Sequence, residues 1–269
     1  MSEEGVEIVR RGIDGFNRQD LRRVRLAAFL AVAMLMLCAS RADGATVDIG
    51  SPLVGSAILG GVGSSRLTFA NVDLSTGHIA SPVDGTLISW RFAGNSGFSF
   101  TPRVIRPTGG ITFTGGGTGA PQQGAGGISG PFPTNLRIKA GDLIGVDPQP
   151  GSQLGVLVGR TGSEYTHWTP SLADGGPGRP PDNLFAANQE VAVAGVVRYC
   201  LVPNLVGQTR AAASASLTAA DCSIGTVRKP RKKPREHGLI VSAQSPAAGT
   251  STSDTEPVDL TFAARKRRR

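Results

Sequence analysis

Short runs rich in Val, Ile, Thr and Phe fill residues 45–198, and clusters of Gly, Pro, Asn or Asp separate them. Within TLISWRF at residues 86–92, Trp90 alternates with Ser89 and Arg91, as on a strand with one buried face. The chain also holds 37 Gly and 18 Pro, which favours turns over long helices. Many short strands at near-regular spacing therefore predict a β-sandwich or jelly roll over residues 45–198.

Charge is spread unevenly along the chain. Residues 1–42 carry seven Arg and five acidic residues, and residues 43–198 carry nine basic and ten acidic residues. Residues 199–269 carry twelve basic and five acidic residues, a net +7, while the whole chain has a formal net charge of +8. The basic character therefore sits in the C-terminal quarter, which is where an anionic partner is expected to bind.

A basic flank and an apolar run stand before the β-rich region. Three arginines within residues 22–25 precede residues 26–40, which are uncharged and mostly apolar, and Ser40-Arg41-Ala42 offers small residues at a cleavage site. The run is shorter than the roughly 20 residues of a membrane-spanning helix. It predicts a helical signal peptide over residues 22–42. The alternative is an uncleaved anchor, the one route by which the protein would contact a membrane, and both interpretations export the rest of the chain.

The first residues, MSEEGVEIVRRGIDGFNRQDL, resemble the opening helix of SnoaL-like proteins. The cone-shaped sheet of that family does not follow them, because the basic and apolar export signal comes next. We therefore treat residues 1–21 as an extension of no assigned function and carry over no SnoaL-like activity.

Two cysteines, Cys200 and Cys222, remain after the signal segment that holds Cys38. Exported proteins enter an oxidising compartment, so an even number of cysteines predicts one disulfide. The alternative is a pair of buried free thiols. Two Cys with no neighbouring His supply too few ligands for zinc, and no metal or cofactor is expected.

The segment from residue 199 to residue 263 predicts a strand, an alanine-rich helix and three further strands, which is a small α+β unit. Its VPNLVG at residues 202–207 and QSPAAGT at residues 244–250 resemble the PASTA domain of penicillin-binding proteins and bacterial Ser/Thr kinases. The resemblance implies an extracytoplasmic bacterial protein that engages peptidoglycan fragments. The chain departs from the family in having one copy, no kinase or transpeptidase domain, and a longer, more basic loop.

That basic loop and the C-terminal tail are the candidate polyanion site. We call residues 228–235 the basic loop and residues 264–269 the basic tail, which holds five more basic residues. The basic residues of the loop are Arg228, Lys229, Arg231, Lys232, Lys233 and Arg235. They predict electrostatic adhesion to peptidoglycan or another anionic wall polymer, and the alternative is a solvated loop and tail that aid solubility. Nucleic acid is not expected, because the protein is exported and no aromatic residues interleave these charges.

The sequence gives little sign of catalysis. Ser163, Glu164 and His167 are close in sequence, but catalytic trios normally converge from distant segments. Asp142 and Asp147 are more typical of Asx turns than of a calcium or hydrolase site. The glycine-rich loops lack the strand and helix context of a phosphate-binding loop. We therefore expect no enzyme.

The aromatic residues of the sandwich suggest a second function, the binding of a glycan. Trp90 is expected in the core, whereas Tyr165 and Trp168 stand in a polar, turn-like stretch where they could flank a glycan groove. Two hypotheses follow: a non-catalytic secreted envelope protein that associates with the cell wall, or a glycan-binding or glycan-processing sandwich anchored by the PASTA-like unit. In both, the chain is mainly β: a β-sandwich or jelly-roll module, then a small α+β PASTA-like module, with an N-terminal helical signal segment.

Overall fold

The computed structural model describes residues 44–185, 188–230 and 238–265. The predicted extension at residues 1–21 and the predicted signal segment at residues 22–42 lie outside the described residues. Within them the chain is mainly β, as predicted, with α2 as the one α-helix. No helix in this described part is both long and apolar enough to cross a membrane.

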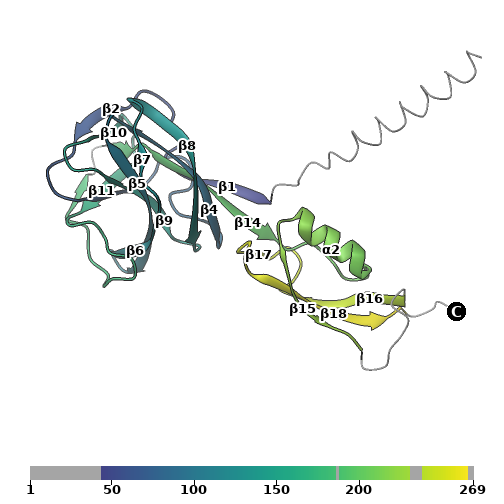
Figure 1. Ribbon diagram of the computed structural model, residues 1–269. Coiled ribbons are helices and arrows are strands. Elements are labelled where there is room, and N and C mark those ends of the chain that lie inside the picture. The colour runs from purple at the N-terminus through teal and green to yellow at the C-terminus, as the bar shows by residue number, and fades with distance from the viewer. Residues whose placement is uncertain (1–43, 186–187, 231–237, 266–269) are drawn as a thin grey trace, which may run out of the picture. The chain divides into compact units, whose positions relative to one another are not determined.

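Two antiparallel sheets form the larger part of the fold, which we call the sandwich (Figure 1). Its strands in chain order are β1 (Ala45–Gly50), β2 (Ile58–Gly61), β3 (Thr68–Asp73), β4 (Gly85–Gly94), β5 (Ser99–Gly109), β6 (Thr112–Thr118), β7 (Gln122–Gln123), β8 (Gly127–Ile138), β9 (Leu143–Pro148), β10 (Gln153–Val158), β11 (Glu164–Trp168), β12 (Asn183–Phe185), β13 (Gln189–Val191) and β14 (Val193–Leu201). The first sheet has the order β1-β14-β4-β10-β13, with β8 paired to β4 and β2 to β10. The second has the order β12-β11-β3-β9-β5-β6, with β7 paired to β5.

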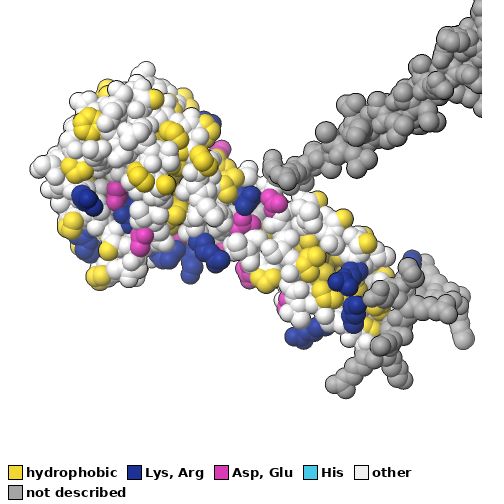
Figure 2. Space-filling model, in the orientation of Figure 1, with side chains coloured by type: hydrophobic (Ala, Val, Ile, Leu, Met, Phe, Trp, Pro, Cys, Tyr) yellow, Lys and Arg dark blue, Asp and Glu magenta, His cyan; other side chains and the backbone are white. Residues whose placement is uncertain are grey.

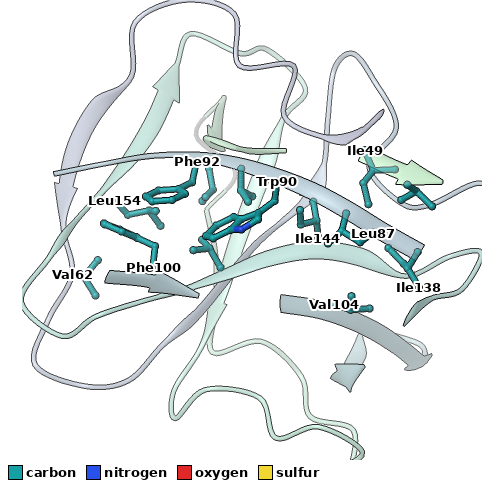
Figure 3. Close-up of a cluster of buried hydrophobic side chains, with 14 residues drawn as sticks. Ile49, Val62, Leu87, Trp90, Phe92, Phe100, Val104, Ile138, Ile144 and Leu154 are labelled. Atoms are coloured by element: carbon teal, nitrogen blue, oxygen red, sulfur yellow. The ribbon is translucent and has the colours of Figure 1, made fainter. Parts of the chain in front are cut away.

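Side chains from both sheets meet in one apolar core (Figure 3). Trp90 and Phe92 enter it from β4, and Phe100 enters it from β5. The rings of Phe92 and Phe100 have their centroids 4.5 Å apart, and those of Trp90 and Phe92 are 4.8 Å apart. The prediction that Trp90 is a core residue is confirmed, since only 1% of it is exposed.

A third, smaller sheet follows the sandwich in sequence. Its order is β15-β18-β16, with β15 parallel and β16 antiparallel to β18. The elements are α2 (Arg210–Ala219), β15 (Ser223–Arg228), β16 (Leu239–Ser245), β17 (Ser251–Thr252) and β18 (Pro257–Ala264). The short β17 pairs with the end of β14. This order of helix and strands matches the α+β unit expected from the sequence.

Buried ion pairs tie strands of the second sheet to the loops beside them. Arg103 on β5 is 4% exposed, and its guanidinium donates to Asp147 Oδ2 at 2.6 Å and to Asp174 Oδ1 at 2.9 Å. Arg106 lies three residues further along β5, and its guanidinium donates to both carboxylate oxygens of Asp142, at 3.0 and 2.7 Å. This contact raises the pKa of the Arg106 guanidinium. Asp142 and Asp147 therefore serve the packing of the sheet.

We predict that Arg103→Leu lowers the free energy of unfolding by about 3 kcal/mol at pH 7, because Asp147 stays buried without its cation. Burial raises the pKa of Asp147 and Arg103 opposes that rise, so the pKa climbs further in the variant. A raised folded pKa makes the folded state bind the proton more tightly than the unfolded state. The loss of unfolding free energy in the variant should therefore become smaller as the pH falls through that pKa. Denaturant unfolding of the wild type and the variant at pH 7 and at about pH 4.5 measures this loss.

The control is Arg137→Leu on the exposed side of β8, which should change stability by no more than about 0.5 kcal/mol. Equal losses in the two variants, or a larger Arg103 penalty at the lower pH, would contradict a buried ion pair.

Candidate functional site

The disulfide joins the end of the sandwich's last strand to the helix of the small unit. Cys200 on β14 is bonded to Cys222, which follows α2, with the two Cα atoms 5.0 Å apart. Both cysteines are buried among Leu205, Leu217 and other apolar side chains of one core cluster. The predicted pairing is confirmed. The disulfide links the end of β14, which precedes α2 in the sequence, to Cys222, which follows α2.

Helix α2 is held by its cap and by two buried side chains. Thr209 is the N-cap, and its side-chain oxygen accepts from the backbone N–H of Ala212 at 3.3 Å. Ala213 and Leu217 are fully buried, one helical turn apart on the face that packs against the small sheet. Among the alanines of α2 only Ala213 is buried, and its small side chain lets the helix approach the sheet closely.

The two motifs quoted from the sequence meet through one side chain, that of Gln244. Its Oε1 accepts from the N–H of Leu205 at 2.8 Å, and its Nε2 donates to the carbonyl of Pro203 at 3.0 Å and of Pro246 at 3.4 Å. A single amide thus satisfies backbone groups of both VPNLVG and QSPAAGT. This role of Gln244 was not predicted, because its partners lie about 40 residues away in the sequence.

A second long-range contact explains the glycine between the motifs. The Oδ1 atom of Asp259 on β18 accepts from the N–H of Thr226 at 2.6 Å. A Cβ at Gly225 would lie 2.3 Å from that same oxygen, so any side chain there would displace Asp259. Gly225 and Asp259 are therefore required together where β15 and β18 pair.

Comparison with known families identifies this unit. Residues 201–264 match the PASTA domain. The resemblance expected from the sequence is confirmed, and the PASTA domain indicates an extracytoplasmic, cell-wall context for the protein. Neither the curated proteins nor the solved structures gave a match to the chain.

The described residues on either side of the basic loop and the start of the basic tail lie at one end of the PASTA sheet. Arg228 closes β15 opposite Thr261 of β18, and β16 begins with Leu239 opposite Ala264. The N–H of Arg265 donates to the carbonyl of Gly238 at 2.7 Å. The chain therefore enters the loop, leaves it and enters the tail at one edge of the domain.

Basic side chains mark that region of the surface, and Figure 2 shows Lys and Arg on the PASTA domain in dark blue. Arg228, Lys229 and Arg265 are exposed. The other predicted binding residues of the basic loop, Arg231, Lys232, Lys233 and Arg235, lie outside the described residues, as do residues 266–269. The loop and the tail are separate segments of the sequence, and the strand register brings their described residues together.

The aromatic pair of the glycan hypothesis is not arranged as expected. Tyr165 and Trp168 lie on strand β11 and not in a turn, and Trp168 is fully buried. Its indole packs against Phe113, with ring centroids 5.3 Å apart, and against Ile105 and Leu143. The expectation that Trp168 borders a groove is wrong, because strands distant in sequence cover it. Tyr165 is half-buried, and burial raises the pKa of its phenol.

The polar trio of the same stretch does not converge either. Ser163 is buried and its Oγ lies 3.3 Å from Glu190 Oε2, a carboxylate that also accepts from Ser51 at 2.9 Å. His167 lies four residues further along an extended segment, which separates the two Cα atoms by about 13 Å. Ser163 thus belongs to a buried network around Glu190.

We predict that replacing Cys200 and Cys222 together by Ala lowers the stability of the PASTA domain by about 2–4 kcal/mol, because the bridge closes a loop of 22 residues. Denaturant unfolding compares the variant with the wild type. As a check on the bond itself, thiol labelling of the native chain followed by peptide mapping should modify neither cysteine. Labelling of both would contradict the assignment.

Proposed function

We propose that the protein is a non-catalytic, secreted bacterial envelope protein that associates with the cell wall through its single PASTA domain. The observation that carries the proposal is the PASTA match over residues 201–264. The ligand class is peptidoglycan or another anionic wall polymer. The predicted export signal at residues 22–42 supports the same compartment.

Electrostatics gives the proposed contact its mechanism. Arg228, Lys229 and Arg265 are exposed around the edge where the basic loop and tail join the domain. A polyanion bound there would be held mainly by long-range attraction to several positive charges, with little shape selection. Exposed charges are screened beyond about 8 Å at physiological salt, so the contact should depend on ionic strength.

The absence of catalysis is part of the proposal, and three observations support it. The carboxylates of Asp142 and Asp147 are engaged by arginines inside the second sheet. The described His167 and Ser163 do not converge. With Trp168 in the core, the aromatic argument for a glycan-processing sandwich loses its support.

We predict that binding to purified cell-wall sacculi weakens steeply between roughly 50 and 500 mM salt. Replacing Arg228, Lys229 and Arg265 by Ser should weaken binding roughly a hundredfold, if each basic residue contributes about 1 kcal/mol as it does at an anionic membrane surface. Co-sedimentation of the full chain over a range of sacculus concentrations measures both effects. Neutralising the whole basic loop should weaken binding further.

The matched control replaces three exposed basic residues of the sandwich, Arg66, Arg137 and Lys139, by Ser. It removes the same charge from the chain and should leave binding nearly unchanged if the PASTA edge is the contact. Salt-insensitive binding that survives both variants would point to a shaped pocket. No binding under any condition would make the PASTA domain a structural spacer.

A further inference from the structure

A hollow of about 760 Å³ lies on the outer face of the first sheet. Strands β1, β14 and β4 run side by side there (Figure 1). Side chains facing outward along the middle of these strands are small, and Ala194, Val196 and Ser89 are among those that line the hollow. Longer side chains, including Asp48, Arg91 and His78, stand around them. This difference in side-chain size explains why the face is concave.

The register of the strands puts Asp48 and Arg91 on the same face of the sheet. Asp48 of β1 pairs with Val196 of β14, which pairs with Ser89 of β4. Arg91 lies two residues beyond Ser89, and residues two apart on a strand point to the same side. Both Asp48 and Arg91 are exposed. The opposite face of the same strands carries Trp90 into the core, where it is 1% exposed.

These charges are not neutralised within the described protein. Neither the carboxylate of Asp48 nor the guanidinium of Arg91 forms an ion pair or hydrogen bond with another described residue. Asp48 and Arg91 lie two strands apart in the sheet and two residues apart along the strand direction. Their Cα atoms are therefore about 12 Å apart. The two side chains are not paired with one another either, and both remain available to a ligand.

We propose that the hollow binds a short zwitterionic peptide of about three residues. The ligand's carboxylate would pair with Arg91, and its ammonium group would pair with Asp48. Three extended residues span about 10–11 Å, which is close to the separation of about 12 Å between the Cα atoms of Asp48 and Arg91. The small side chains leave room for the peptide backbone, and the hydroxyls of Thr46 and Ser89 in the lining supply hydrogen-bonding groups.

The lining favours a peptide over a glycan. Sugars bind well against exposed aromatic faces, and among the described lining residues the indole of Trp90 is turned into the core. The two opposite charges, by contrast, have a direct match in the two ends of a peptide. This site is in the sandwich and does not involve the PASTA domain's basic edge, so the two proposals can fail separately.

Calorimetric titration of the full chain with simple peptides tests the proposal. Trialanine with free ends should bind more tightly than dialanine, because the shorter peptide cannot reach both charges. Acetylating its amino end or amidating its carboxyl end should each weaken binding about tenfold, since each change removes one charge-assisted hydrogen bond. N-acetylglucosamine serves as the neutral sugar probe and should bind more weakly than trialanine.

Two charge-neutralising variants make the test specific to each end of the ligand. In Arg91→Gln, amidating the peptide should no longer weaken binding, while acetylating it still should. In Asp48→Asn, the opposite pattern should appear. Arg137→Gln and Asp73→Asn, at exposed positions outside the lining, are the matched controls and should behave as the wild type.

All these substitutions are at exposed positions, so thermal unfolding should remain unchanged. The proposal is overturned if trialanine shows no binding at millimolar concentration. It is equally overturned if blocked peptides bind as tightly as the free peptide, or if the sugar binds better than either.

Discussion

Strand β14 is the element on which the rest of the structure depends. It pairs with β1 on one side and β4 on the other, and its final residues, Cys200 and Leu201, pair with β17. Val193 and Val197 belong to the sandwich core, whereas Cys200 belongs to the PASTA core. From the same strand, Arg198 donates to Asp254 at 3.0 Å. One extended segment therefore contributes to both hydrophobic cores and carries the disulfide.

Much of this architecture could be predicted from local patterns. Alternation identified the strands, and export chemistry with an even cysteine count predicted the disulfide. The PASTA motifs were recognisable because turn residues and glycines occupy fixed positions. Trp168 was misplaced for a physical reason: its neighbours in sequence are polar, but Phe113 and Ile105, which cover it, come from strands over 50 residues away. Burial of a strand's face depends on such partners, and local sequence does not contain them.

The hollow could not be predicted for a similar reason. Asp48 and Arg91 are 43 residues apart in sequence, and β14, which follows Arg91 by about 100 residues, lies between their strands. Only the register of three strands puts a carboxylate and a guanidinium on one face at a distance that a short peptide spans. The basic loop and tail meet through register as well, since the pairing of β15, β16 and β18 brings their described ends to one edge.

Cell fractionation of a bacterium that produces the protein tests whether the protein is exported and associates with the cell wall. We predict that the protein is recovered with the wall fraction, is released when the wall is digested by a muramidase, and has an N-terminus within a few residues of Asp43 by mass spectrometry. Recovery of the intact chain, beginning at Met1, in the cytosolic fraction would contradict it.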